Sequence, residues 1–182
     1  MSATLVLGGA RSGKSAHAEK LAAQSGRDVV YIATARAGDG EMATRIARHR
    51  NSRPTHWTTV EEPLQLADAL TRHSTSNNLI LVDCLTLWLS NLLFDGAGTY
   101  PDVGAIILPP LFAEQRTALL AVLQKVPGDV VLVSNEVGMG IVPMGAVSRC
   151  FTDEAGRLNQ AVAAVCERVL FVAAGLPLAL KG

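Results

Sequence analysis

"GGARSGKS", residues 8–15, is the stretch that decides the fold of this chain. Its members are Gly8, Gly9, Ala10, Arg11, Ser12, Gly13, Lys14 and Ser15. The pattern G-x-x-x-x-G-K-S, placed between an apolar run and a helix-like stretch, is typical of a phosphate-binding loop. Backbone N–H groups of such a loop point at phosphate oxygens, the lysine reaches the β- and γ-phosphates, and the serine hydroxyl can bind Mg²⁺. The loop predicts a nucleoside triphosphate site, because a plain turn has no need of the Lys14-Ser15 pair.

Apolar, β-prone runs alternate with helical periodicity along the rest of the chain. The expected strands cover 4–8, 28–33, 79–83, 129–134 and 168–173, and the expected helices cover 14–24, 40–50, 62–72, 110–125 and 154–166. This alternation predicts an α/β fold of the P-loop type, with a mostly parallel sheet and helices on both faces. Residues 176–180 are expected to return as a short antiparallel edge strand, and residues 95–110 to form the most mobile loop.

Length and composition indicate one compact domain spanning residues 1–182. Apolar residues make up 49%, yet no apolar run approaches the roughly 20 residues that cross a bilayer, and the start is unlike a signal peptide. We therefore expect a cytoplasmic protein without a membrane span. The net charge of zero gives no excess of positive charge of the kind that binds nucleic acid or an anionic membrane. Three cysteines without ligand spacing fit reduced, buried thiols.

Polar residues follow several of the expected strands, where ligands bind in open α/β sheets. Besides the phosphate-binding loop, these are Thr34-Ala35-Arg36, Asp83 and Ser134-Asn135-Glu136. Asp83 closes an apolar run, which is how a carboxylate associated with Mg²⁺ is presented beside such a loop. An ordinary helix cap is the alternative for Asp83. Glu136 could hold a base, a substrate hydroxyl or only its own loop, and the sequence does not choose among these roles.

A cluster of basic residues lies between positions 45 and 53. It contains Arg45, Arg48, His49, Arg50 and Arg53. On a helix, His49 shares a face with Met42 and Ile46, so its ring should point inward with the apolar residues. Such an imidazole is either a satisfied core histidine beside a solvated basic face or a nucleophile at a polyphosphate. The surrounding arginines disfavour a protonated ring, and a nucleophile must be neutral.

Several segments together have the order and spacing of one known family. The early segments are residues 8–15, Tyr31-Ile32-Ala33-Thr34-Ala35, Arg45-Ile46-Ala47-Arg48-His49-Arg50, Arg53-Pro54 and His56-Trp57. The later segments are Glu61-Glu62-Pro63, Asp83-Cys84-Leu85-Thr86, Asn91-Leu92-Leu93, residues 135–143, Asp153 and residues 156–160. The chain resembles the bifunctional adenosylcobinamide kinase / adenosylcobinamide-phosphate guanylyltransferase of cobalamin biosynthesis. The resemblance covers nearly the whole chain, and the run 135–143 is more specific than the phosphate-binding loop alone.

This resemblance implies a homotrimer of α/β subunits that carries out two reactions. In the first, the aminopropanol hydroxyl of adenosylcobinamide takes the γ-phosphoryl group of ATP or GTP. In the second, GMP passes from GTP to a histidine, with release of pyrophosphate, and then to adenosylcobinamide phosphate, which gives adenosylcobinamide-GDP. The resemblance places the nucleophile at His49.

The same resemblance implies a set of nucleotide contacts in addition to the phosphate-binding loop. They are Thr34, Ala35, Arg36, Arg50, Asn51, Ser52, Arg53, Glu62 and Asp83. We expect Mg²⁺ to be bound through Ser15 and Asp83, with ATP and GTP as substrates. The chain departs from the family pattern at Arg48, where some members carry a second histidine, and at Met144-Gly145-Ala146 and Thr152, which replace a more polar stretch.

Two other classes of function fit the sequence less well. A GTPase switch would carry an Asn-Lys-x-Asp segment for guanine, and none of the lysines follows an asparagine. A monofunctional small-molecule kinase would use the same loop and Asp83 but would leave His49 without a task. The sequence leaves open the preferred phosphoryl donor, the residues that bind the corrinoid and whether both activities are retained.

Overall fold

The computed structural model describes residues 2–36, 54–94 and 100–182, which form a single-domain α/β structure around a seven-stranded sheet. The sheet has the order β3-β2-β4-β5-β1-β6-β7. Its strands are β1 (Ala3–Gly8), β2 (Asp28–Ala33), β3 (Thr58–Glu61), β4 (Asn78–Asp83), β5 (Asp129–Asn135), β6 (Arg168–Ala173) and β7 (Leu176–Lys181). All neighbouring strands are parallel except β6 and β7. The predicted mostly parallel sheet with an antiparallel edge strand is confirmed.

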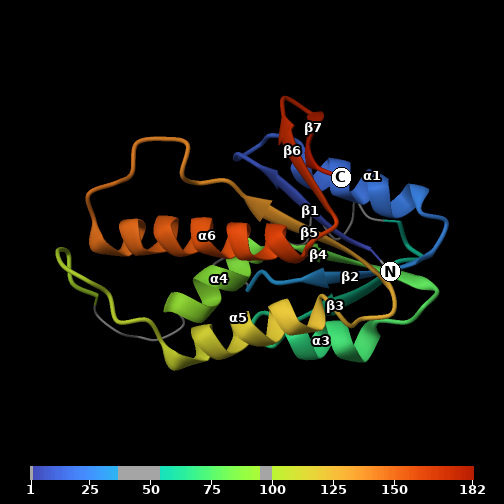
Figure 1. The fold of residues 1–182 in the computed structure, drawn as a ribbon, viewed down its shortest axis with the longest axis horizontal. Helices are drawn as coiled ribbons and strands as arrows, with labels where there is room; N and C mark the ends of the chain where they lie inside the picture. Colours follow the sequence, from blue (N-terminus) through green and yellow to red (C-terminus); the bar gives the residue numbers. More distant parts are fainter. Residues whose placement is uncertain (1, 37–53, 95–99) are drawn as a thin grey trace.

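Helices cover both faces of the sheet, but unequally (Figure 1). They are α1 (Lys14–Gln24), α3 (Leu66–His73), α4 (Leu85–Phe94), α5 (Pro110–Val122) and α6 (Ala146–Val165). In the part of the chain that the structure describes, α1 packs on one face, and the other four helices lie on the opposite face. None of these helices is both long and apolar enough to cross a membrane.

The strand interiors are apolar on both sides because both faces of the sheet are covered. Side chains alternate between the faces, so in β1 Leu5 and Leu7 join the core under α4, α5 and α6, whereas Val6 joins the core under α1. In β4, Ile80 and Val82 face the larger core. Continuous apolar runs of this length are typical of central parallel strands, which explains why the sequence located them well.

Two elements were missed by the sequence analysis. Helix α4 escaped because it is apolar on nearly every side: Leu85, Trp88, Leu89 and Leu93 are all buried, which leaves no polar stripe to mark a helix. Strand β3 escaped because it has only four residues and lies half-exposed at the edge of the sheet.

Three helix boundaries were also predicted wrongly. Helix α6 begins at Ala146 rather than at residue 154, helix α3 begins at Leu66 rather than at residue 62, and helix α5 ends at Val122 rather than at residue 125. Before α3, the Glu62 carboxylate accepts the backbone N–H groups of Leu64 and Gln65 at 3.0 and 2.8 Å, so these residues form a turn that precedes the helix. The expected helix 40–50 lies outside the described residues.

The strand register brings the functional segments to one end of the sheet. Gly8 at the end of β1 pairs with Asn135 at the end of β5, and Ala33 at the end of β2 pairs with Asp83 at the end of β4. We call this end, where the parallel strands finish, the carboxyl edge. Ligands of open α/β sheets bind at such an edge, so the register places the predicted site residues where a ligand would be expected.

Candidate active site

The phosphate-binding loop runs from the end of β1 to the first residue of α1. It is closed by a backbone hydrogen bond in which the Ser12 N–H donates to the Gly9 carbonyl at 3.2 Å. A Cβ added at Gly8 would lie 2.4 Å from the Ser12 Oγ and 2.5 Å from the Val172 carbonyl oxygen. Gly13 has φ of 93°, in the left-handed region. Both positions therefore require glycine, as the motif predicts.

Lys14 is the first residue of α1 and only 8% exposed. Its ammonium Nζ donates to the Gly9 carbonyl at 3.1 Å, so the side chain folds back over the loop. Ser15 follows it in the same helical turn and is half-buried. The N-terminal end of a helix attracts anions, and the lysine adds a full positive charge there. This arrangement is suited to binding a polyphosphate.

The turn between β6 and β7 holds the loop from outside. Ala174 and Gly175 have φ of 51° and 79°, so the hairpin closes through two left-handed residues. The Gly175 N–H donates to the Ser12 carbonyl at 2.8 Å. A Cβ at Gly13 would lie only 3.0 Å from the Gly175 Cα. The last two strands thus form one wall of the phosphate-binding loop.

Asp83 and Thr34 lie together where β4 and β2 end. The Thr34 hydroxyl is fully buried; it donates to the Cys84 carbonyl at 2.7 Å and accepts the Cys84 N–H at 2.9 Å. The Thr34 N–H donates to the Asp83 carbonyl at 3.2 Å, and the Tyr31 hydroxyl donates to Asp83 Oδ2 at 3.0 Å. These hydrogen bonds fix the backbone at Asp83 and hold its carboxylate. The peptide bond between Asp83 and Cys84 is cis. Ala35 continues from Thr34 along the same edge.

Glu62 lies next to this pair through the backbone. Its N–H donates to the Ala33 carbonyl at 2.9 Å, while its carboxylate accepts the Leu64 and Gln65 N–H groups of the turn before α3. Asn91 of α4 donates to the Thr34 carbonyl at 2.8 Å and to the Pro63 carbonyl at 3.1 Å, and so ties the two segments together. The hydrogen bonds of the Glu62 carboxylate stabilise the turn before α3, and a contact of Glu62 with a nucleotide stays a prediction.

A buried polar network fixes the end of β5 between β4 and β1. The Asn135 N–H donates to the Thr86 hydroxyl at 2.7 Å, and its carbonyl accepts from Asn159 Nδ2 at 3.2 Å. The Ser134 hydroxyl donates to Asn159 Oδ1 at 2.7 Å and lies 3.4 Å from the Thr86 hydroxyl. The Glu136 N–H then donates to the Gly8 carbonyl at 3.0 Å. Glu136 was among the predicted polar residues at this edge, whereas no sequence pattern gave a role to Thr86 or Asn159.

Five of the predicted site residues lie outside the described residues. They are His49, Arg50, Asn51, Ser52 and Arg53. Their assignments as nucleophile and nucleotide contacts therefore stay predictions from the sequence.

The donor set at the carboxyl edge fits Mg²⁺. Ser15 offers a hydroxyl and Asp83 a carboxylate, and Mg²⁺ prefers hard oxygen ligands, of which the protein usually supplies one or two beside substrate phosphates. Within residues 2–36, 54–94 and 100–182, no group of three or more His, Cys, Asp or Glu side chains is placed to hold a metal ion. A metal shared with a bound triphosphate is consistent with both observations.

Cys84 follows Asp83 but is unsuited to act as a nucleophile. Burial, assisted by the nearby Asp83 carboxylate, raises the pKa of the Cys84 thiol to about 11. The thiolate is the reactive form of cysteine, and at neutral pH it is scarce when the pKa is so high. This thiol therefore belongs to the packing of the site.

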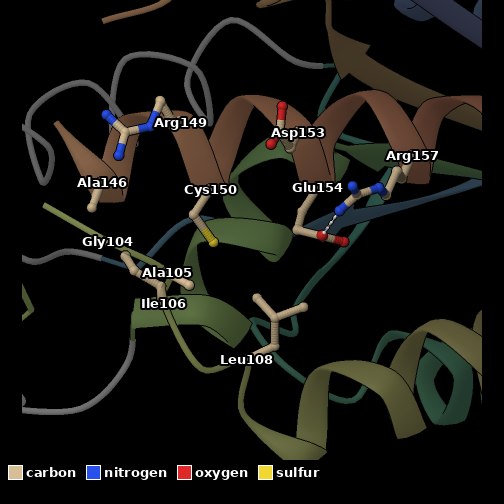
Figure 2. Close-up of a pocket in the computed structure, with 10 residues that line it drawn as sticks. All are labelled: Gly104, Ala105, Ile106, Leu108, Ala146, Arg149, Cys150, Asp153, Glu154 and Arg157. Atoms are coloured by element: carbon tan, nitrogen blue, oxygen red, sulfur yellow. Dashed lines mark hydrogen bonds and ion pairs between the residues drawn. The ribbon is translucent and has the colours of Figure 1, made fainter. Parts of the chain in front are cut away.

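A separate pocket lies between the first half of α6 and the segment 104–108 (Figure 2). It has a volume of about 300 Å³. Ile106, Leu108 and Cys150 line it, and the buried Glu154 carboxylate pairs with Arg157 at its wall. None of the predicted site residues that the structure describes lines this pocket.

The chain matches a known protein family over nearly its whole length. The family described as "Cobinamide kinase / cobinamide phosphate guanyltransferase" matches residues 4–180. The chain belongs to this family. It is 55% identical over 178 residues to the bifunctional adenosylcobalamin biosynthesis protein CobP of Pseudomonas aeruginosa, covering 98% of this chain and 96% of the relative. Identity to CobU of Escherichia coli is 44% over 179 residues, covering 97% and 98%. This cobinamide kinase / guanylyltransferase family member is therefore an enzyme, as the sequence predicted.

Solved structures extend the likeness of this family member to the fold. An ATPase of the type III secretion system of pathogenic bacteria has a TM-score of 0.58 at 14% identity, covering 98% of this chain and 56% of that one. A Pyrococcus horikoshii protein, PH0250, has a TM-score of 0.52 at 9% identity, covering 100% and 86%. At such low identity these likenesses show the shared fold alone.

Proposed function

We propose that the protein phosphorylates the aminopropanol hydroxyl of adenosylcobinamide with ATP or GTP and then transfers GMP from GTP to adenosylcobinamide phosphate. The products of the second reaction are adenosylcobinamide-GDP and pyrophosphate. The observation that carries this proposal is a family match over 4–180 on a chain whose phosphate-binding loop, with Lys14 folded over it, lies at the carboxyl edge. Cobinamide kinase and guanylyltransferase chemistry both need a bound nucleoside triphosphate, and one such loop supports both.

In the kinase reaction, the protein acts by positioning and by charge. The N–H groups of the loop and the Lys14 ammonium bind the phosphates and stabilise the charge that develops on the transferred group. Ser15 and Asp83 would hold Mg²⁺, which when bound neutralises phosphate charge. No covalent intermediate with the protein is needed, because the substrate hydroxyl attacks the γ-phosphorus directly.

In the guanylyl transfer, His49 is the proposed nucleophile. The neutral imidazole attacks the α-phosphorus of GTP, and the bond to the leaving pyrophosphate breaks. The phosphate of adenosylcobinamide phosphate then displaces the imidazole and takes the GMP. A covalent intermediate divides one difficult displacement into two in-line steps. The sequence pattern that predicts His49 on the apolar face of a helix, and its arginine neighbours in the sequence, support this role.

A homotrimer of subunits and a cytoplasmic location complete the proposal. Support for the trimer comes from the resemblance to the family, and size-exclusion chromatography with light scattering tests it. Support for the location comes from the bacterial biosynthetic relatives.

The proposed function is tested with GTP labelled at either the α- or the γ-phosphate and incubated with adenosylcobinamide. We expect γ-label in adenosylcobinamide phosphate, and α-label first in an acid-labile, base-stable protein adduct and then in adenosylcobinamide-GDP. A histidine phosphoramidate has this stability, whereas a serine phosphoester does not. Phosphorylation without any protein adduct would favour a monofunctional kinase.

The nucleophile is tested with His49→Ala and His49→Asn. Both variants should lose the α-labelled adduct and adenosylcobinamide-GDP, because neither side chain can form a phosphoramidate. Phosphorylation of adenosylcobinamide should survive, since it needs no protein nucleophile. His56→Ala, at the next histidine along the chain, is the matched control and should retain the adduct. Persistent labelling of the His49 variants would move the nucleophile elsewhere.

A further inference from the structure

The kinase reaction needs a site for its acceptor, and the end of β5 has the features of one. Strand β5 lies between β1, which leads into the phosphate-binding loop, and β4, which ends at Asp83. Glu136, the first residue after β5, therefore lies between the two segments proposed to bind the triphosphate and its metal. Its N–H donates to the Gly8 carbonyl at 3.0 Å, which couples it directly to the start of the loop.

The backbone that carries Glu136 is held from both sides. Thr86 of α4 accepts the Asn135 N–H, and Asn159 of α6 donates to the Asn135 carbonyl. Both side chains are buried, at 7% and 6% exposure, and both are joined to the Ser134 hydroxyl. Such a fully bonded buried network gives the following residue a fixed position, which a group that orients a substrate requires.

The Glu136 carboxylate itself is bound on one oxygen. Oε1 accepts the Gly138 N–H at 2.6 Å, and the side chain is only half-buried. Within the described residues, the structure gives the second oxygen, Oε2, no partner. The other carboxylates at this edge have different settings: that of Glu62 accepts the N–H groups of Leu64 and Gln65, and that of Asp83, the proposed Mg²⁺ ligand, accepts the Tyr31 hydroxyl. Glu136 therefore offers an oxygen to a substrate hydroxyl directly beside the start of the loop.

The segment that follows Glu136 is exposed and uncharged. From residue 137 to residue 148 the chain contains no ionisable side chain. Within this stretch Met139, Ile141 and Met144 are 78%, 99% and 90% exposed. The segment extends away from the carboxyl edge between β5 and the start of α6 (Figure 1). Exposed apolar groups gathered on one segment mark an interaction site, and methionine adapts well to irregular apolar ligands.

We propose that Glu136 and the segment 137–144 form the acceptor site, in which the Glu136 carboxylate binds the substrate hydroxyl and the apolar segment binds the corrin ring. This inference rests on the proposed kinase function. The ring with its methyl groups and neutral amides matches an apolar, uncharged surface, and the short hydroxyl-bearing arm must reach the γ-phosphate at the loop. Continuity of the segment with Glu136 satisfies both requirements.

In the reaction, the hydroxyl oxygen forms a bond to the γ-phosphorus while the bond from the γ-phosphorus to the bridging oxygen breaks. The electron pair of that bond leaves with the nucleoside diphosphate. The hydroxyl proton passes to the Glu136 carboxylate and then to water. General-base help of this kind contributes about 10²- to 10⁴-fold to the rate.

The carboxylate is tested with Glu136→Gln. The amide oxygen of glutamine can still accept the Gly138 N–H, so the loop is preserved and only the base is lost. We expect kcat for phosphorylation of adenosylcobinamide to fall about hundredfold or more. Labelling by α-labelled GTP, and GMP transfer to supplied adenosylcobinamide phosphate, should stay at wild-type rates because neither step removes a hydroxyl proton. Glu114→Gln, at an exposed position on α5, is the matched control.

The apolar segment is tested with Ile141→Asn, with Ile107→Asn before α5 as the control at another highly exposed isoleucine. We expect the KM for adenosylcobinamide to rise about tenfold in the first variant only, with the KM for GTP and the mass in solution unchanged. An unchanged KM for adenosylcobinamide would overturn the role of the segment. A changed mass in solution would assign it to contacts between copies of this chain, which also overturns it.

The outcomes separate this inference from the proposed function. If the wild-type enzyme transfers no γ-phosphoryl group to adenosylcobinamide, the proposed function fails. If the wild type does so and Glu136→Gln matches it, or if Glu136→Gln loses both activities equally, the acceptor site alone is overturned. Asn159→Ala tests the supporting network, with the exposed neighbour Gln160→Ala as control. We expect Asn159→Ala to lower kcat for phosphorylation while leaving α-label incorporation intact.

Discussion

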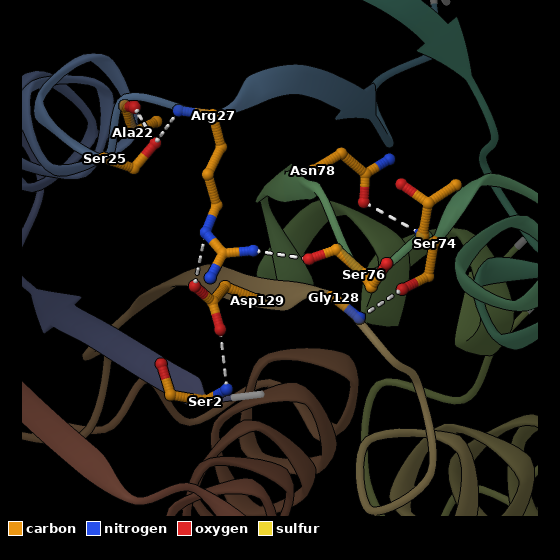
Figure 3. A network of polar contacts seen from close by, with 10 residues as sticks. Ser2, Ala22, Ser25, Arg27, Ser74, Ser76, Asn78, Gly128 and Asp129 are labelled. Atoms are coloured by element: carbon orange, nitrogen blue, oxygen red, sulfur yellow. Dashed lines mark hydrogen bonds and ion pairs between the residues drawn. The ribbon is translucent and has the colours of Figure 1, made fainter.

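The two ends of the parallel sheet both carry polar networks, but they use them differently. At the amino end, where the strands begin, polar groups satisfy one another (Figure 3). Asp129 accepts the Ser2 N–H at 2.8 Å and pairs with Arg27 at 3.1 Å, and Arg27 also donates to the Ser76 carbonyl at 2.7 Å. Ser74 accepts the Gly128 N–H at 3.0 Å. These contacts link separate strand starts and point at no ligand.

At the carboxyl edge, polar contacts hold the backbone beside the residues of the candidate site. Thr34, Thr86 and Asn159 bind main-chain groups next to Asp83 and Glu136, whose carboxylates accept the Tyr31 hydroxyl and the Gly138 N–H. Polar side chains therefore link the strands to one another at the amino end and support the candidate site at the carboxyl edge. The comparison indicates that changes at the amino end should cost stability, whereas changes at the carboxyl edge should cost catalysis.

The largest effect is expected for Lys14→Ala at the carboxyl edge. The same ammonium contacts the phosphates whether the γ- or the α-phosphorus is attacked, so both activities should fall about hundredfold or more. Urea unfolding should change little by comparison, and Lys20→Ala on the exposed side of α1 is the control. Near-normal guanylyl transfer by Lys14→Ala would show that the two reactions use separate nucleotide sites.

A smaller effect is expected for Asp83→Asn. If this carboxylate holds Mg²⁺ directly or through water, turnover should fall about tenfold or more at limiting Mg²⁺, and added Mg²⁺ should recover part of the loss. Circular dichroism should be unchanged, because an amide can still accept the Tyr31 hydroxyl. An unaltered Mg²⁺ dependence would show that Asp83 is a structural residue, like the polar residues at the amino end of the sheet.

Asp129→Ala at the amino end should affect stability instead of activity. The variant loses the acceptor of the Ser2 N–H and the partner of Arg27, which should lower the free energy of unfolding by about 1 to 3 kcal/mol. Thermal unfolding followed by circular dichroism measures this loss, with Glu114→Ala on α5 as control. The kcat of both reactions should stay at the wild-type level. A lower kcat without a loss of stability would contradict the assignment of the amino end to stability and of the carboxyl edge to catalysis.

The smallest effect concerns Cys166, which is buried just before β6 at the amino end. Burial raises the pKa of its thiol from 9.0 to about 11. As the pH rises above 9, the unfolded chain releases this proton before the folded protein does, so the stability from the neutral thiol is lost between about pH 9 and 11. Urea unfolding at pH 8 and at pH 10.5 should show a weaker pH dependence for Cys166→Ala than for the wild type. An identical dependence would contradict this shift.

The sequence predicted the central sheet well because strands that are covered on both faces must be apolar along their length. Strands β2 and β6 have the bounds that their apolar runs predicted, and α1 begins at the lysine of the motif. Helix α4 was missed because a helix buried on all sides has no periodic polar stripe. Strand β3 was missed because its order in the sheet comes from long-range pairing with β2, which no local pattern encodes.

For the candidate site, the sequence indicated only the local parts. The loop and Asp83 are readable because their neighbours in sequence are also their neighbours in space. Asn159 supports Asn135 across 24 positions, and Thr86 reaches it across 49, so the support depends on how α4 and α6 pack. No single-sequence pattern marks these two residues as parts of a ligand site, although both lie in segments that resemble the family.

The hairpin of β6 and β7 links a late part of the chain to the predicted phosphate-binding loop. The Gly175 N–H is bonded to the Ser12 carbonyl, and the Gly175 Cα lies close to Gly13. If triphosphate binding orders the loop and the hairpin turn together, the two are thermodynamically coupled. A substitution that loosens the turn at Ala174-Gly175 should then weaken triphosphate affinity, although the turn lies more than 150 residues from the loop in sequence.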